Sequence, residues 1–332
     1  MRAFVITAPG KGEVQEVAEP VATEGLVVVQ VERAGLCGTD MEFFSGAMSY
    51  LDEGHATYPM RIGHEWCGTV VDVGPGVDSG WLGRRVTGDT MLGCRHCERC
   101  RSGRQHLCAD RYEIGVRRGW PGALAARLPV PEWALYPLPD SVDVTMGAMI
   151  EPGGNALRAV RAAGLTPGER LLVLGPGTIG LLAAFIAAAQ GAEVHVLGLS
   201  TDFARSVGIT NAWTVDDLPE LRWDAVIDAS TGAELPALAA RLVEPGRRVV
   251  YIGISEQPSP VDSRWFVLKD ITAVGVLSAS GGLAGAIELY ASGAVDPRPL
   301  VGATVRLDEV VDILARRWHP PAPKVLVNPA SS

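Results

Sequence analysis

The chain has 332 residues, of which 47% are hydrophobic and 20% are charged, and its formal net charge at pH 7 is −9. This length exceeds the size at which a single hydrophobic core stops growing, so two domains are expected. The composition is that of a folded globular protein rather than a disordered one. The negative charge argues against nucleic acid as a partner, because phosphate binding needs a basic surface.

No export signal is predicted. Residues 1–14 lack the apolar core and small-residue cleavage site of a signal peptide. The longest apolar run, Leu181–Ala189, is too short to span a bilayer. We therefore expect a cytoplasmic protein, whose six cysteines bind metal rather than form disulfides, because the cytosol keeps thiols reduced.

Residues 1–150 are expected to form an irregular β domain. Residues 26–32 and 69–74 have the composition of strands, and Gly and Pro interrupt the apolar runs up to about residue 139. Residues 146–165 carry Ala and Leu at helical spacing, which predicts a helix that ends at Gly164.

Residues 151–275 alternate short apolar strands with helices of about a dozen residues. Such alternation predicts an α/β, doubly wound parallel sheet that helices cover on both faces. The expected strands are 170–175, 193–198, 224–230, 247–253 and 271–277, and the expected helices are 180–191, 202–207 and 234–243. A helix at 281–293 and a strand at 324–328 follow in the C-terminal segment.

Four cysteines fall within fifteen residues, namely Cys94, Cys97, Cys100 and Cys108. Their gaps of two, two and seven residues let a lobe formed by residues 90–110 wrap one tetrahedral ion. The zinc–sulfur distances would be about 2.3 Å. Four thiolates close the coordination sphere, so this zinc site is predicted to be structural rather than catalytic.

Gly175, Gly177 and Gly180 form a GxGxxG pattern, which also contains Thr178 and Ile179, directly after a predicted strand and at the start of a helix. In this context the glycines allow a tight turn and the close approach of a pyrophosphate to the helix N-terminus. The pattern therefore predicts a dinucleotide-binding site.

The end of the following strand favours NADP over NAD. Sites that prefer NAD place an acidic residue there to hold the ribose hydroxyls, but this strand ends in Gly198 and Leu199. Ser200, Thr201 and Arg205 could instead bind a 2′-phosphate. NAD is the alternative cofactor.

Cys37, His64 and Glu65 form a second candidate metal site, in the β domain. These side chains suit zinc, and three protein ligands leave one position open for a substrate oxygen. Glu151, at the boundary between the two predicted domains, is a further candidate ligand. Two glutamates and a thiolate would make the metal less electrophilic, so only one glutamate is expected to bind it.

Taken in order, these motifs resemble those of the zinc-dependent medium-chain dehydrogenases over essentially the whole chain. The matching segments are CGTD (37–40), GHE (63–65), the four-cysteine lobe, EP (151–152) and GPGTIG (175–180). The resemblance implies a GroES-like irregular β-barrel catalytic domain (1–150), a Rossmann domain (151–275) and a segment (276–332) that returns to the catalytic domain. It also implies two zinc ions per chain, one structural and one catalytic, the latter in the cleft between domains.

Glu151 replaces a ligand cysteine of the simple alcohol dehydrogenases, so the resemblance is closer to the polyol, sugar and threonine dehydrogenases. Glu42, Glu113 and Asn155 match places where the glucose dehydrogenase branch binds sugar hydroxyls. The resemblance thus implies substrate contacts for Glu113, Glu151 and Asn155. Glu42 stands where many members carry the outer His of a proton relay; relaying protons, binding substrate and a solvated carboxylate are its three interpretations.

Two residues beside Cys37 are further catalytic candidates. The resemblance implies Thr39 as the first acceptor of the alcohol proton, and a locally satisfied hydroxyl is the alternative. Asp40 is expected to accept a hydrogen bond from the free ring N–H of His64 and so orient the ring, or else to cap a helix.

The sequence thus predicts an enzyme that transfers hydride between a nicotinamide cofactor and a secondary alcohol of a polyol, sugar or cyclitol, giving a ketone or lactone. Glucose, an inositol and an aminocyclitol all fit. The alternatives are a threonine-like amino alcohol dehydrogenase and a non-catalytic dinucleotide-binding protein. The apolar strands 249–253 and 271–277 are expected to pair chains into a homodimer or homotetramer.

Overall fold

The computed structural model describes residues 1–255, 257–318 and 320–330. The chain divides into two compact units. Unit 1 consists of Met1–Glu151, Tyr290–Ser292 and Asp296–Ser332, and unit 2 consists of Pro152–Leu289 and Gly293–Val295.

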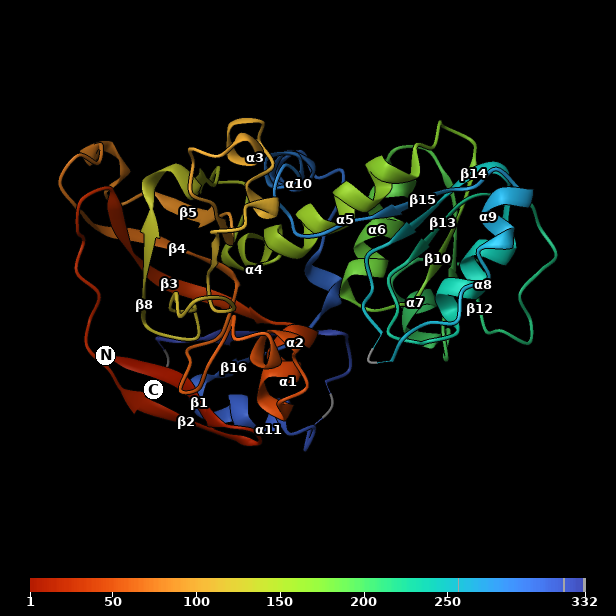
Figure 1. Ribbon diagram of the computed structural model, residues 1–332. Helices are drawn as coiled ribbons and strands as arrows, with labels where there is room; N and C mark the ends of the chain where they lie inside the picture. Colours follow the sequence, from red (N-terminus) through yellow and green to blue (C-terminus); the bar gives the residue numbers. More distant parts are fainter. Residues whose placement is uncertain (256, 319, 331–332) are drawn as a thin grey trace. The chain divides into compact units, whose positions relative to one another are not determined.

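Unit 1 is built mainly from β-strands, which Figure 1 shows in red, orange, yellow and blue. β1 (Arg2–Ala8) and β2 (Lys11–Glu16) form an antiparallel hairpin. A seven-stranded sheet has the order β16-β17-β3-β4-β5-β9, with β8 paired to β3. Its strands are β3 (Leu26–Leu36), β4 (Glu65–Val73), β5 (Arg85–Gly88), β8 (Arg127–Pro131), β9 (Leu135–Pro137), β16 (Val301–Arg306) and β17 (Lys324–Asn328).

Short helices and one small hairpin complete unit 1. The hairpin pairs β6 (Met91–Leu92) with β7 (Tyr112–Glu113) beside the four-cysteine lobe. The α-helices are α1 (Gly38–Ser45), α2 (Ser49–Asp52), α3 (Glu98–Arg101), α4 (Val144–Ala148) and α11 (Val310–Leu314). The 3₁₀ turns are η1 (Ser79–Trp81), η2 (Gln105–Leu107), η3 (Glu132–Ala134), η4 (Arg298–Leu300) and η5 (Leu307–Glu309).

The strand order of unit 1 brings distant parts of the sequence together. β17 lies between β16 and β3, with Val325 opposite Leu36. On the other side of β3, Gly35 lies opposite Glu65 at the start of β4. The ends of three strands therefore meet immediately before Cys37, which follows β3.

Unit 2 contains a parallel six-stranded sheet of order β12-β11-β10-β13-β14-β15. Helix α6 (Thr178–Ala189) lies on one face of the sheet and α8 (Leu235–Leu242) on the other (Figure 1). The strands are β10 (Arg170–Leu174), β11 (Glu193–Leu197), β12 (Ala212–Trp213), β13 (Trp223–Asp228), β14 (Val243–Tyr251) and β15 (Thr272–Gly275). The helices are α5 (Ile150–Ala163), α6 (Thr178–Ala189), α7 (Asp202–Ser206), α8 (Leu235–Leu242), α9 (Arg264–Leu268) and α10 (Leu283–Ala291). The first two residues of α5 and the last two of α10 belong to unit 1.

The parallel sheet with helices on both faces and the mainly β unit 1 confirm the predicted fold class, a doubly wound α/β domain together with an irregular β domain. The helix expected over 146–165 is instead two helices, α4 and α5. Met149 separates them because its N–H bonds to the carbonyl of Met146, only three residues earlier, which tightens the turn.

The end of unit 2 differs from the expected boundary at residue 276, because residues 276–289 lie in unit 2. The start of α10 packs tightly on α5. A Cβ on Gly282 would lie 2.2 Å from the carbonyl oxygen of Gly154, and one on Gly285 would lie 2.6 Å from Leu157. Among the described residues, no helix combines the length and the apolar character needed to cross a membrane.

Candidate active site and metal centres

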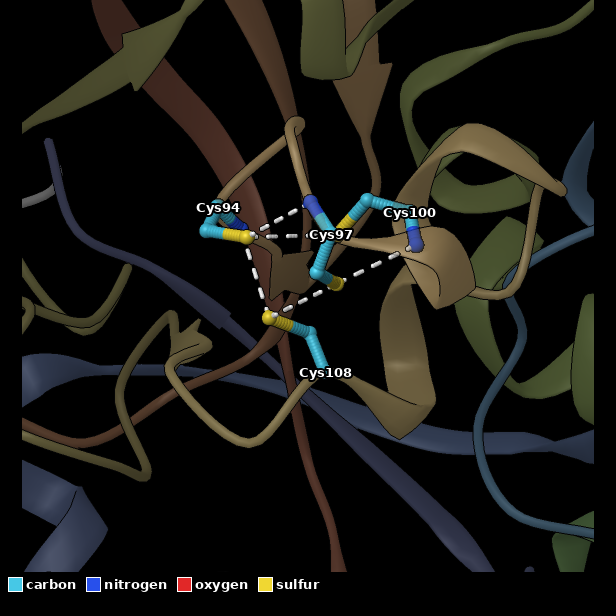
Figure 2. A group of neighbouring side chains, drawn as sticks. All are labelled: Cys94, Cys97, Cys100 and Cys108. Carbon is cyan, nitrogen blue, oxygen red and sulfur yellow. Dashed lines mark hydrogen bonds between the residues drawn. The ribbon is translucent and has the colours of Figure 1, made fainter.

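The four cysteines of the lobe converge on one point, as Figure 2 shows. Their sulfur atoms all lie within 4.8 Å of one another. The Cys94–Cys100 and Cys97–Cys108 sulfur pairs are each 3.9 Å apart. A tetrahedron with zinc–sulfur bonds of about 2.3 Å has edges of roughly 3.8 Å. The cluster therefore has the dimensions of a tetrathiolate zinc site.

Backbone groups and burial give these thiols different acidities. N–H groups of the lobe, first that of Cys97, lower the pKa of Cys94 to about 6, whereas desolvation raises the pKa of Cys100 to about 12. Cys97 and Cys100 donate N–H···S bonds to the preceding cysteines at 3.4 and 3.5 Å. Four thiolates at this spacing require a cation between them, so the donor set fits zinc.

The second donor set lies where β3 ends and β4 begins. One donor atom each from Cys37, His64 and Glu65 lies within 4.8 Å of the others. His64 and Glu65 are buried, and Cys37 is partly buried. A thiol, an imidazole and a carboxyl group at this spacing can hold a zinc ion and leave a position free for substrate.

The charges around His64 favour its protonated form when no metal is bound. Burial alone would lower the pKa of His64, but the charge of Asp40, then a hydrogen bond with Cys37 and the charges of Cys37 and Glu151, raise it well above its usual value. Zinc must therefore displace a proton from this imidazole.

Asp40 caps α1 rather than hydrogen-bonding to His64. Its Oδ2 accepts the N–H of Cys37 at 2.9 Å, and its Oδ1 accepts the N–H of Gly63 at 3.3 Å. The His64 Nδ1 atom is 3.7 Å from Oδ1 and has no hydrogen-bond partner among the described residues. Asp40 thus ties Cys37 and the turn before His64 together through the backbone, and it acts on the imidazole only through its charge.

Glu65 has a cationic partner that the sequence does not suggest. The Lys324 ammonium donates to both carboxylate oxygens, at 2.8 and 2.6 Å, and to the Leu36 carbonyl at 2.9 Å. Lys324 and Glu65 are 2% and 1% exposed. A Cβ on Gly35 would lie 2.0 Å from Glu65 Oε2, so glycine is required where the carboxylate crosses β3.

The other predicted site residues differ in position and burial. Thr39 is in the first turn of α1, two residues after Cys37, and Glu42 lies one turn later; both are partly buried. Glu151 is buried and is not part of the three-residue donor set, although its charge reaches His64. Asn155, also buried, lies on α5 four residues after Glu151.

Glu113 is held by neighbouring side chains rather than presented freely. It is 3% exposed, and its Oε1 accepts from Arg111 Nε at 2.7 Å and from the Tyr50 hydroxyl at 3.4 Å. Its segment passes close to the donor set, because a Cβ on Gly115 would lie 2.6 Å from the Gly63 carbonyl oxygen. One carboxylate oxygen is thus already used inside the protein.

The three glycines of GPGTIG each have a distinct place in unit 2. Gly175 directly follows β10 and adopts φ +94°, a backbone conformation that favours glycine. Gly177 caps α6, which begins with Thr178 and Ile179, and a Cβ there would meet nothing within 4 Å. A Cβ on Gly180 would lie 2.0 Å from the Gly175 carbonyl oxygen. Gly180 therefore serves close packing, while Gly177 leaves space in front of the helix N-terminus for a phosphate.

The residues expected to bind a 2′-phosphate follow β11. Ser200 is exposed, and its Oγ accepts the N–H of Asp202 at 3.3 Å. Thr201 precedes α7. Arg205 is exposed on α7, and its Nη2 donates to the Ala212 carbonyl at 2.9 Å. That bond holds the Nη2 side of the guanidinium group against β12.

Comparison with known proteins identifies the kind of protein to which the chain is similar. The pattern described as Alcohol dehydrogenase GroES-like domain matches residues 23–140. A 2-dehydro-3-deoxy-L-galactonate 5-dehydrogenase from Pseudoalteromonas atlantica is 31% identical over 322 residues, which is 91% of each chain. An L-threonine 3-dehydrogenase from Saccharopolyspora erythraea is 33% identical over 294 residues, which is 83% of each chain. A solved alcohol dehydrogenase from Escherichia coli CFT073, complexed with NADH, superposes with a TM-score of 0.90 at 26% identity over 99% of both chains.

Proposed function

Since this chain belongs to the zinc-dependent medium-chain dehydrogenases, which move hydride between an alcohol and a nicotinamide cofactor, we propose that its substrate is a polyol, sugar or cyclitol. A secondary hydroxyl of that substrate is oxidised to a ketone or lactone. The observation that carries the proposal is the Cys37, His64 and Glu65 donor set, which would leave a coordination position on a bound zinc for a substrate oxygen.

Cys37, His64 and Glu65 are the proposed ligands of the catalytic zinc, and Cys94, Cys97, Cys100 and Cys108 are those of the structural zinc. When bound, the catalytic zinc supplies Lewis acidity toward a hydroxyl, and the nicotinamide supplies the hydride acceptor. Lys324 holds the Glu65 carboxylate at 2.6 Å and offsets part of its charge. The Cys37 thiolate and the partly neutralised Glu65 carboxylate would together leave a bound zinc ion electrophilic.

The Thr39 hydroxyl is the proposed first acceptor of the substrate proton. It lies in the first turn of α1, and Asp40 fixes that turn to Cys37 and Gly63. Glu42, one turn further along the same helix, is the proposed next acceptor. Thr39→Val should therefore lower kcat strongly, whereas Thr39→Ser should retain most of it.

For the substrate, Glu113, Glu151 and Asn155 are the proposed partners of its remaining hydroxyls. Each is buried and polar, and carboxylates and amides are suitable hydrogen-bond partners for sugars. The galactonate and threonine enzymes that this chain is similar to make sugar acids and amino alcohols the natural comparison substrates. Preference for threonine over every polyol would instead favour amino alcohol oxidation.

NADP is the proposed cofactor. Ser200, Thr201 and Arg205 follow β11 without an acidic residue at the strand end to repel a 2′-phosphate. KM for NADP should be lower than KM for NAD, and Arg205→Ala should reduce this preference. A wild-type enzyme with the lower KM for NAD would refute the assignment.

Metal analysis combined with a substrate screen tests the central proposal. Wild-type protein should contain about two zinc ions per chain and Cys37→Ala about one. Polyols, sugars and cyclitols are then assayed with both nicotinamide cofactors, and Cys37→Ala should abolish turnover. Cys67→Ala is the matched control, because Cys67 is buried and its Sγ donates to the Val144 carbonyl at 3.1 Å. Full activity in Cys37→Ala would overturn the proposal.

A further inference from the structure

Unit 1 contains a cavity of about 250 Å³ that none of the proposed metal ligands lines. Its walls come from the β1–β2 hairpin, from residues 56–61 and from residues 116–121. It is therefore a separate feature of unit 1 that the dehydrogenase reaction does not explain.

Of the described residues that line this cavity, Arg61 alone is charged. Its side chain is partly buried, and burial lowers its pKa. Among the described residues, no hydrogen bond or ion pair engages its guanidinium group. Two other arginines of unit 1 have carboxylate partners: Arg111 binds Glu113 at 2.7 Å and Arg85 binds Glu32 at 3.1 Å. A partly buried guanidinium group without an acceptor keeps most of its five donors available for an anion.

The remaining walls are largely apolar. Met60 and Val116 are buried, and the Trp120 ring is partly buried. The Trp120 indole N–H already donates to the Pro129 carbonyl at 3.1 Å, so the ring offers only its apolar surface to the cavity. A ligand that fits these walls has an apolar, preferably flat, body.

Backbone hydrogen bonds hold the walls in place. Met60 exchanges both of its backbone hydrogen bonds with Ile6 of β1, each at 3.0 Å, and the Arg61 carbonyl accepts the N–H of Gly122 at 3.0 Å. These bonds connect the three segments that surround the cavity. The cavity is thus formed before any ligand arrives, which lowers the entropic cost of binding.

We propose that this cavity is a binding site for a small organic acid, whose carboxylate pairs with Arg61 and whose apolar body packs against Met60, Val116 and Trp120. The volume lies just below the range of about 300–1,000 Å³ that is typical of ligand pockets, so the acid is small, of the size of an aromatic monocarboxylate. A bidentate carboxylate–guanidinium pair provides the specificity for the anion.

Isothermal titration calorimetry of the zinc-loaded, full-length protein with benzoate tests this assignment. Benzoate should bind saturably at one site per chain, and benzyl alcohol and inorganic phosphate should each bind at least about tenfold more weakly. Arg61→Met should weaken benzoate binding by at least about tenfold. Arg61→Lys should weaken it less, because it keeps the charge and loses only the bidentate geometry.

Two control variants distinguish binding in this cavity from binding at a surface cation or at the catalytic metal. Arg84→Met removes an exposed cation elsewhere on unit 1 and should leave benzoate binding unchanged. Cys37→Ala should also bind benzoate normally, because a carboxylate held by the catalytic metal would be lost with that metal.

Three results would each overturn the proposal: the absence of saturable binding at millimolar benzoate, equal affinity for benzyl alcohol, and unchanged affinity in Arg61→Met. Loss of binding in Cys37→Ala would place the anion at the metal instead. If Arg61→Met does not fold, Arg61→Lys and the comparison of benzoate with benzyl alcohol decide the question. None of these results depends on dehydrogenase activity.

Discussion

Glu65 and Lys324 form a buried ion pair whose two members are 259 residues apart in the sequence. Burying two charges costs several kcal/mol, and their attraction offsets this cost only where the geometry is good and other polar groups are satisfied. Here the ammonium donates to both carboxylate oxygens and to the Leu36 carbonyl. Removing Lys324 takes away both hydrogen bonds that its ammonium donates to the buried Glu65 carboxylate.

Lys324→Met should therefore destabilise unit 1 strongly. In zinc-free protein we expect the free energy of unfolding to fall by about 3–5 kcal/mol, because the Glu65 carboxylate is then an unpaired buried charge. Zinc bound at Cys37, His64 and Glu65 supplies a replacement positive charge, so the loss should be smaller in zinc-loaded protein. Denaturant unfolding with and without a chelator measures both values.

The double variant Lys324→Met with Glu65→Gln is the control for this prediction. It removes the unpaired charge and should recover part of the lost stability in zinc-free protein. If Lys324→Met unfolds at the same denaturant concentration as the wild type under both conditions, the ion pair contributes nothing and the argument fails.

At the scale of single residues, local motifs were sufficient to predict which side chains converge but not which partners they have. Cys37, His64 and Glu65 stand in short motifs whose residue types match zinc chemistry, and they converge in the structure. Lys324 could not be found in this way, because it meets Glu65 only through the placement of β17 beside β3. The sequence around Lys324 shows only that a charged residue begins an otherwise apolar strand.

Asp40 shows a different limit of prediction. Its position three residues after Cys37 fits both a cap for α1 and a partner for His64. The structure selects the cap, with Oδ2 on the Cys37 N–H at 2.9 Å and the imidazole Nδ1 3.7 Å from Oδ1. A difference of about 1 Å separates these two roles, and the sequence does not specify positions to that precision.

At the scale of the elements, two glycines of the turn between β10 and α6 have different roles: Gly180 allows close packing, and Gly177 is proposed to leave room for the cofactor. Gly180→Ala should destabilise unit 2 by about 1–3 kcal/mol, because its Cβ would lie 2.0 Å from the Gly175 carbonyl oxygen. Gly177→Ala should change stability by less than about 1 kcal/mol, because its Cβ meets no protein atom. Thermal unfolding checks both values.

Cofactor binding should be affected by Gly177→Ala, the variant that hardly changes stability. Gly177→Ala places a methyl group where the pyrophosphate approaches the helix N-terminus, so the Kd for the dinucleotide should rise at least about tenfold. Cofactor titration monitored by fluorescence measures this change. Normal dinucleotide affinity in a folded Gly177→Ala protein would contradict the assigned site.

The four-cysteine lobe is an element whose structure should depend on its metal. Cys100→Ser should remove about one zinc ion per chain and leave the Cys37 site loaded. Because α3 and η2 are only 4 and 3 residues long, they cannot hold the lobe in place alone. Limited proteolysis should then cut within residues 90–110 first, and an uncut lobe without zinc would be the contrary result.

The regular elements of unit 2 could be predicted better than those of unit 1. Each parallel strand is a short apolar run between turn residues, and this signal is local. In unit 1, α1 follows Cys37 directly, and its start depends on the Asp40 cap and on Gly63, which is 23 residues further along the chain. Such contacts are not visible in a hydrophobic pattern.

For the molecule as a whole, the edge of the unit 2 sheet predicts self-association. β15 is the last strand of the sheet, and Thr272, Ala273 and Gly275 on it are exposed. The neighbouring helix α9 leaves Val267 and Leu268 81% and 79% exposed. An unpaired strand edge beside exposed apolar residues is a template for pairing with a second chain.

Light scattering after size-exclusion chromatography should therefore detect a dimer or tetramer. Ala273→Glu should shift the protein toward monomer, because two like charges would face each other across the paired strands. Ala18→Glu, at an exposed position of unit 1, should leave the mass unchanged. A monomeric wild-type protein would rule out this interface.

Because unit 1 is discontinuous, residues around its proposed metal site are far apart in the order of synthesis. A ribosome produces β3 and β4, with Cys37, His64 and Glu65, then all of unit 2, and only afterwards β17 with Lys324. Until that strand emerges, β3 lacks a neighbour and the Glu65 carboxylate lacks its cation. Any change that displaces β17 would therefore alter the surroundings of the proposed metal site, although Glu65 and Lys324 lie 259 residues apart in the sequence.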